Sequence, residues 1–236
     1  TTSVHDAALL LNAIAGQDPA DPITLEAKRV ADYTAGLATA SLQGVRIGVL
    51  RKAVGERADI AALFETALAD LTRAGAVLVD LDYETPPTFW HSTLPVLMYE
   101  LRGEMDKSLS TRPVADGPRS LADVVAFNKA QPRDELRWFG QDLLEQALTT
   151  TDAAAYQENL ATIRRMTRAE GIDKLLTDNQ VAFLIAPTMG PAWSTDLVLG
   201  DNFSGRTGAG YLAAIAGYPH LTVPMGAVEG LPIGLS

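Results

Sequence analysis

A strand–helix–strand succession in residues 45–82 constrains the fold of this chain more than any other feature. Val45 to Leu50 is a short apolar run typical of a buried strand, and Ala76 to Asp82 is a second one. Between them, residues 58–74 place apolar side chains at helical spacing, and Gly75 follows. This order forms a crossover unit, which in nearly all proteins is right-handed and joins parallel strands. We therefore predict an α/β protein with a mixed, mainly parallel, twisted sheet flanked by helices.

The N-terminus is predicted to be helical. Ser3 and Asp6 fit the capping pattern that satisfies free backbone N–H groups in a first helical turn, and the apolar stretch to Ala15 continues the helix. Gly16 is expected to end it in the left-handed conformation.

The middle of the chain has a different texture. Residues 90–178 are predicted to be largely helical, with turns at the DGP triplet and near Pro132. A third buried strand is expected at 181–186, and the chain closes with a short helix at about 207–217 and a pair of apolar strands. No internal repeat is visible. The prediction is one α/β unit with a helical insertion at about residues 90–178.

Length and charge exclude several classes of protein. The chain has 236 residues, of which 47% are hydrophobic, and a formal net charge of −10. Its densest basic cluster, at 164–168, lies in a helical, acid-flanked stretch and is interpreted as a solvated helix face, so no nucleic-acid partner is expected. The apolar runs are far shorter than the ~20 residues of a membrane span, so no membrane partner is expected. The cytoplasm is the default location, although an incomplete N-terminus would hide a signal peptide.

Local motifs give no convincing catalytic or metal site. The chain has no cysteine, and its three histidines are isolated in sequence, so neither a metal nor another cofactor is expected. Residues 200–207 nearly match a phosphate-binding loop, but Arg206 replaces the lysine and no strand leads into it. The glycines of 208–213 are interpreted as helix packing, and His220 as a structural residue rather than a catalytic one.

Four stretches, taken together and in order, resemble the amidase signature family. They are TSVHDAALLLNAIAG, LQGVRIGVL, VAFLIAPT and AIAGYPHLTVPMGAVEGLPIGLS. The last of them looks closest to the peptide amidase subgroup. The resemblance implies that residues 1–236 are the C-terminal portion of one amidase domain, with no separate second domain, and that the first half of the same protein is missing.

The resemblance also implies a chemistry. Members of the family hydrolyse amides with a nucleophilic serine, a second serine on a cis peptide and a neutral lysine. Those motifs precede the stretch where this chain begins, so no residue of the chain is assigned a catalytic role, and the segment alone is expected to be inactive. Peptide amides or small amides are the expected substrates.

The loop after Thr188 is the candidate for substrate binding, through Trp193, Phe203 and Ser204, because loops beyond strand ends commonly form pocket walls. The alternative for the aromatic residues is that they cap the core. Two other functions stay open: the ammonia-transferring component of a tRNA-dependent amidotransferase in the same family, and a non-catalytic α/β binding module.

Overall fold

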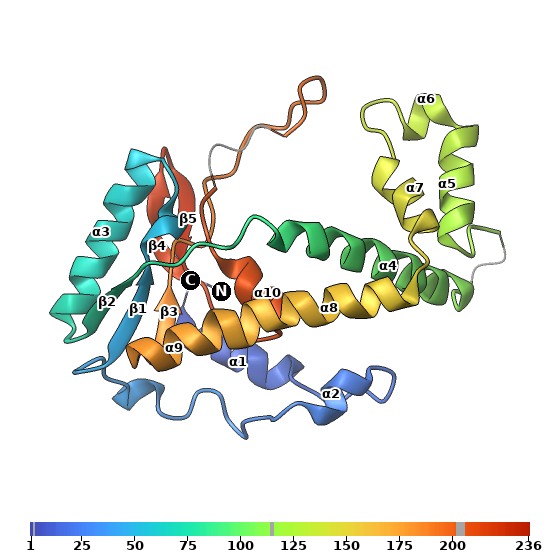
Figure 1. Cartoon of the computed structure of the whole chain (residues 1–236). Coiled ribbons are helices and arrows are strands. Elements are labelled where there is room, and N and C mark those ends of the chain that lie inside the picture. The colour runs from blue at the N-terminus through green and yellow to red at the C-terminus, as the bar shows by residue number, and fades with distance from the viewer. Residues whose placement is uncertain (2, 114–115, 202–205) are drawn as a thin grey trace.

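A computed structural model describes residues 1, 3–113, 116–201 and 206–236 of the chain (Figure 1). The described elements, in chain order, are α1 (Val4–Ile14), α2 (Pro22–Glu26), η1 (Leu37–Thr39), β1 (Arg46–Leu50), η2 (Arg51–Val54), α3 (Ala58–Arg73), β2 (Val77–Leu81), α4 (Phe89–Ser110), α5 (Leu121–Ala130), α6 (Pro132–Glu135), α7 (Asp142–Thr149), α8 (Ala153–Thr167), the π-helical η3 (Arg168–Ile172), α9 (Asp173–Asn179), β3 (Phe183–Ile185), α10 (Gly210–Ala216), β4 (Val223–Val228) and β5 (Leu231–Leu235).

The predicted crossover unit is confirmed and forms the centre of the fold. Strand β1 lies between β2 and β3 and is parallel to both, with Gly48 opposite Val79 on one side and Leu184 on the other. Helix α3 connects β1 to β2, as the spacing of its apolar residues predicts. The side chains of Ile47 and Val49 are completely buried, which is expected for a strand paired on both edges and covered on both faces.

The two closing strands form a separate, antiparallel sheet beside the parallel one. Strands β4 and β5 form an antiparallel hairpin, whose turn has positive φ angles of 49° at Glu229 and 82° at Gly230. The β5 end then pairs with the chain leaving β3: Ser236 N–H donates to the Ala186 carbonyl at 2.8 Å, and Ala186 N–H donates back at 3.1 Å. The parallel sheet β2-β1-β3 and the β4–β5 hairpin are thus two sheets, joined next to this pair by an isolated antiparallel bridge between Pro187 and Leu235.

Helices cover the two faces of the central strands (Figure 1). On one face, α3 packs against β1 through the fully buried side chains of Ile60 and Phe64. On the other face, Ile172 of η3, together with Leu212 and Ala216 of α10, packs against the ends of β1 and β2. The sheet is therefore the middle layer of three.

The predicted helical insertion leaves the sheet after β2 and returns at β3. Helices α4 and α8 lie side by side, with Phe89, Val96 and Ile163 buried between them, while α5 to α7 form the far end of the insertion (Figure 1). Helix α8 leads through η3 into α9 with a kink at Gly171, whose φ and ψ of −108° are not helical. At η3, Arg168 turns to α10 and its Nε donates to the Ala216 carbonyl at 2.7 Å, which ties the insertion to α10.

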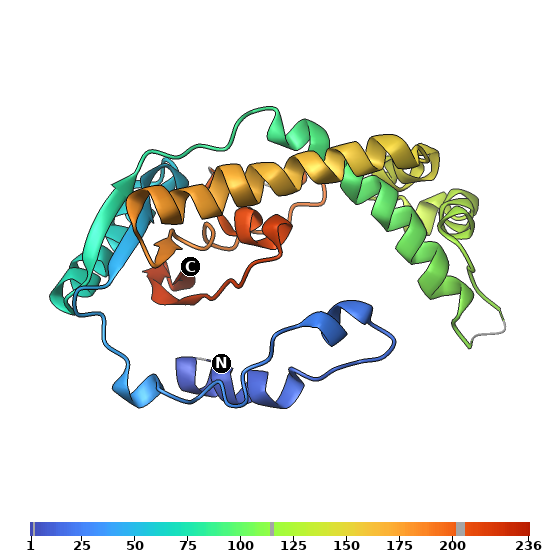
Figure 2. The same cartoon turned by 60° about the horizontal axis from the view of Figure 1, so that its bottom comes forward.

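The N-terminal segment is scarcely covered by the rest of the described chain (Figure 2). The predicted cap of α1 is confirmed, because Ser3 Oγ accepts from Asp6 N–H at 3.0 Å. No residue of α1 is buried, and Leu10 and Ile14 are 52% and 68% exposed. The expectation for Gly16 is wrong: α1 ends with Ala15 as its C-cap, at φ −74°, and Gly16 does not have a positive φ.

Candidate functional site

The candidate site lies where the chain leaves the carboxyl ends of β1 and β3. Parallel strands end at the same edge of a sheet, and ligand sites of α/β proteins are usually built from the loops that follow. After β3, the Thr188 N–H donates to the Gly234 carbonyl of β5 at 2.7 Å. The loop that follows returns to the exit of β1, where Gly208 N–H donates to the Ala53 carbonyl at 2.7 Å and Thr207 Oγ1 donates to the Val54 carbonyl at 3.0 Å. The chain that follows β3 is thus hydrogen-bonded to the chain that follows β1.

Three hydroxyl groups meet at this edge. Thr188 Oγ1 lies 2.7 Å from Ser236 Oγ and donates to Thr222 Oγ1 at 3.3 Å. The third side of the triangle, from Thr222 Oγ1 to Ser236 Oγ, is also 3.3 Å. We call these three side chains the hydroxyl cluster.

Two glycines make room for the hydroxyl cluster. A Cβ at Gly234 would lie 2.4 Å from Thr222 Cγ2 and 2.7 Å from Thr188 Oγ1. A Cβ at Gly208, where φ is +101°, would lie 2.3 Å from the Thr188 carbonyl oxygen. These distances are below van der Waals contact, so Gly234 approaches the cluster, and Gly208 the backbone of Thr188, as only glycine can.

The loop after Thr188 has a defined shape in its described part. Trp193 Nε1 donates to Asp201 Oδ1 at 3.2 Å, across the two limbs of the loop. At the tip, Asp196 Oδ1 accepts the N–H groups of Leu199 and Val198, both at 2.8 Å, and these two bonds lower the pKa of Asp196. The tip side chains are 84% and 83% exposed at Val198 and Leu199. The loop therefore presents an apolar tip on a hydrogen-bonded frame.

Of the three predicted substrate-binding residues, Trp193 lies in this loop and is 38% exposed. Phe203 and Ser204 lie outside the described residues. The structure adds the hydroxyl cluster, which sequence reasoning missed. Its residues come from three separate segments and carry no local motif. The only available signal was that all three fall in the two C-terminal stretches that resemble the amidase signature family.

The other motifs contribute packing rather than chemistry. Gly208 approaches the Thr188 carbonyl, and a Cβ at Gly210 would lie 3.3 Å from His220 Nε2. Both glycines therefore accommodate close neighbours, but these are a main-chain carbonyl and a histidine ring and not another helix. His220 is itself exposed beside the start of α10.

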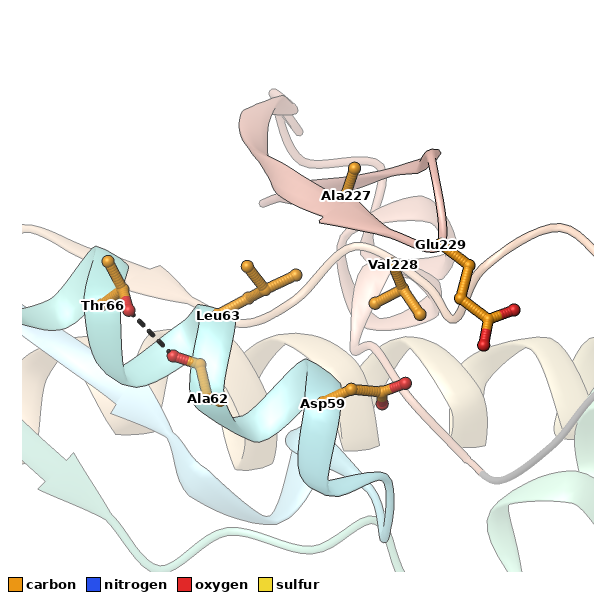
Figure 3. Close-up of a pocket in the computed structure, with 7 residues that line it drawn as sticks. All are labelled: Asp59, Ala62, Leu63, Thr66, Ala227, Val228 and Glu229. Carbon is orange, nitrogen blue, oxygen red and sulfur yellow. Dashed lines mark hydrogen bonds between the residues drawn. The ribbon is translucent and has the colours of Figure 1, made fainter.

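A hollow of about 500 Å³ lies between α3 and the β4–β5 hairpin (Figure 3). Asp59 and Glu229 stand at one end of it and Thr66 at the other. Thr66 Oγ1 donates to the Ala62 carbonyl at 3.0 Å within its own helix. Arg57 binds Asp59 and lowers the pKa of that carboxyl group. The residues that line the hollow include no nucleophile paired with a base, so it offers little catalytic chemistry.

Within residues 1, 3–113, 116–201 and 206–236, no group of three or more histidine, aspartate or glutamate side chains is placed to hold a metal ion. Among the helices described, none combines the length and the apolar character needed to cross a bilayer.

Comparison with known proteins gives a consistent family. The family model described as Amidase matches residues 1–236. The native peptide amidase of Stenotrophomonas maltophilia is 40% identical, with a TM-score of 0.87 over 99% of this chain and 47% of its own. The peptide amidase PAM in complex with the competitive inhibitor chymostatin is 41% identical, with a TM-score of 0.89 over 99% of this chain and 48% of its own.

A curated relative has a different described role. It is the A-subunit of the glutamyl-tRNA(Gln) amidotransferase of Pseudomonas fluorescens (strain Pf0-1), which is 30% identical over 99% of this chain and 49% of its own length. The chain spans about half the length of the relatives it matches.

Proposed function

Because this chain belongs to the amidase family, we propose that the intact protein is a serine hydrolase that cleaves the carbon–nitrogen bond of amides. The main support is the agreement in both sequence and backbone with peptide amidase structures, at 40–41% identity and TM-scores of 0.87 and 0.89. Peptide amides or small amides are the proposed substrates.

We further propose that residues 1–236 are the C-terminal portion of a single amidase domain. The chain matches about half of each relative, at 47–49% of their length. In the described chain, α1 has no buried residue, and β4 is paired with β5 on one edge alone and has only Val228 buried. An uncovered apolar helix and an unpaired strand edge are surfaces that folded proteins normally cover. The other half of the amidase domain is the proposed cover for both.

The same proposal places the catalytic residues outside this chain. In the family, the nucleophilic serine attacks the amide carbonyl and a neutral lysine takes its proton through the second serine. Backbone N–H groups stabilise the oxyanion that forms. Residues 1–236 contain no G-S-S-G sequence, so the present chain would supply part of the sheet and walls of the substrate pocket.

Trp193, Phe203 and Ser204 are proposed to line that pocket. Trp193 supports this, since its indole is hydrogen-bonded to Asp201 within the loop that follows β3 and keeps 38% of its surface exposed. In the intact protein, Trp193→Ala should raise the KM clearly while changing the melting temperature little. An unchanged KM with a large drop in melting temperature would place Trp193 in the core instead.

The amidotransferase alternative rests on the 30% identity to the Pseudomonas fluorescens relative. Against it, the solved peptide amidases reach 40–41% identity over the same residues. The formal net charge of −10 also gives no support for a surface that binds tRNA.

A fluorophosphonate probe tests the proposed function directly, because it reacts with activated serines. The intact protein should be labelled and should release ammonia from an amidated peptide without added metal. Residues 1–236 expressed alone should remain unlabelled. Robust labelling of this segment would mean that one of its own serines is the nucleophile, and an intact protein that is neither labelled nor active would refute the hydrolase assignment.

A further inference from the structure

We propose that the hydroxyl cluster of Thr188, Thr222 and Ser236 binds an uncharged amide group, and that through it the intact protein binds an amide substrate in preference to the acid it produces. The identity of the ligand rests on the proposed function, whereas the position of the site rests on the structure.

The three hydroxyls are unequally engaged with one another. The contact between Thr188 and Ser236 has the ordinary length of an O–H···O bond, at 2.7 Å. Both contacts of Thr222 are 3.3 Å, longer than the usual range. The Thr222 hydroxyl is therefore the least committed of the three. Thr222 is also the exposed member, whereas Thr188 and Ser236 are half-buried.

The partners of Thr222 are fixed in place by their backbone. Thr188 N–H is bound to Gly234, and Ser236 pairs with Ala186 through both its N–H and its carbonyl. Gly234 lacks the Cβ that would collide with Thr222 and Thr188. A site whose polar groups are held before the ligand arrives loses less conformational entropy on binding.

The chemistry of the cluster matches an amide and not a carboxylate. A hydroxyl group both donates and accepts, and an amide offers both an accepting carbonyl and donating N–H groups. A carboxylate only accepts, and it loses its hydration on entering a site unless a cation compensates it. None of the hydrogen bonds found for the three hydroxyls involves a charged group. The site is at the carboxyl end of β3, where the loop that carries Trp193 begins.

The experiment compares an amidated dipeptide with the corresponding free acid in the intact protein. Thr222→Val keeps the shape of the side chain and removes its hydroxyl. We expect the KM for the amide to rise about 2- to 12-fold, as for the loss of one neutral hydrogen bond, while the inhibition constant of the acid changes less than about twofold. Thr222→Ser should restore the wild-type ratio of the two constants, which a purely structural role would not predict.

Thr66→Val is the matched control. The Thr66 hydroxyl is also hydrogen-bonded within the protein, since it donates to the Ala62 carbonyl at 3.0 Å, but Thr66 lies on α3, away from the hydroxyl cluster. Thr66→Val should leave the KM for the amide and the inhibition constant of the acid unchanged. If Thr222→Val does not melt cooperatively, Ser236→Ala replaces it. An unaltered amide-to-acid ratio in these variants, or the same change in Thr66→Val, would overturn the proposal.

The two proposals fail separately. If the wild-type protein hydrolyses no amide, the amidated dipeptide persists and its binding is measured by calorimetry. Binding of the amide that is lost in Thr222→Val would then support the hydroxyl cluster and refute the hydrolase. Hydrolysis by the wild-type protein, with the same amide-to-acid ratio in Thr222→Val, would support the hydrolase and refute the hydroxyl cluster. Absence of amide binding by a wild-type protein without activity would refute both.

Discussion

Replacing Gly208 by alanine should destabilise the protein more than the same replacement at Gly230, although both glycines have positive φ angles, of +101° and +82°. At either position the left-handed backbone costs an L-residue about 1–2 kcal/mol. Around Gly230 nothing lies within 4 Å of the added Cβ, so this cost is the whole effect there. At Gly208 the Cβ would meet the Thr188 carbonyl oxygen at 2.3 Å.

The contact with the Thr188 carbonyl oxygen is what should make Gly208→Ala less stable than Gly230→Ala. A carbonyl oxygen of the main chain cannot rotate away as a side chain can, and forcing an extra carbon into a packed region costs typically about 1–3 kcal/mol. Gly208→Ala should thus lose about 2–5 kcal/mol of unfolding free energy, and Gly230→Ala about 1–2 kcal/mol.

Urea unfolding of the intact protein, followed by tryptophan fluorescence, measures both losses. Wild type should be the most stable, followed by Gly230→Ala and then Gly208→Ala. Equal losses, or a smaller loss at Gly208, would show that the approach of Gly208 to Thr188 is not a constraint on the fold.

Three further results are expected. Phe64→Ala should cost about 3–5 kcal/mol, because Phe64 is completely buried between α3 and β1; a loss below about 1 kcal/mol in urea unfolding would contradict that packing. In residues 1–236 expressed alone, Leu10→Gln with Ile14→Gln should reduce the fluorescence of a hydrophobic dye without lowering the melting temperature, because both side chains are exposed on α1; an unchanged dye signal would mean that α1 is covered. The hydrogen bond from the Arg119 N–H lowers the pKa of Asp123 below 3.8, so the ionised carboxylate stabilises the start of α5 fully above that pH and progressively less as the pH falls through the lowered pKa. Asp123→Asn should flatten this part of the pH–stability curve. A curve identical to wild type would refute the contribution.

Local patterns in the sequence predicted the elements well. The expected strand at 45–50 is β1 at Arg46–Leu50, and the expected helix at 58–74 is α3 at Ala58–Arg73. Strand β1 is a continuous apolar run buried on both faces, and α3 has the helical period of one buried face. Gly75, at φ +95°, marks the end of α3 as predicted. The prediction of a left-handed Gly16 was wrong because a local pattern alone does not fix that conformation. A glycine permits a left-handed cap but does not require one, and no residue of α1 is buried against a neighbour that would select it.

Features that depend on distant residues were not predictable in this way. The pairing of Ser236 with Ala186 and the meeting of Thr188 with Thr222 follow from how separate segments align in space, which the spacing along the chain does not encode. The π-helical turn at η3 is similar. The contact of Arg168 with α10 depends on a distant segment, although Gly171, where the backbone leaves helical geometry, was a local signal.

The order of the central strands has a consequence for how this fold can vary. Strand β1 pairs with β3, and roughly 135 residues, including the whole helical insertion, separate Ile47 from its partner Phe183. The entropy lost in closing a loop grows only with the logarithm of its length, so doubling this loop would cost about 0.6 kcal/mol. The sheet is thus nearly indifferent to how much chain is placed between β2 and β3. Helices α5 to α7, at the far end of the insertion, are where this architecture can lengthen, shorten or accept a foreign segment while the strand edge that carries the hydroxyl cluster stays as it is.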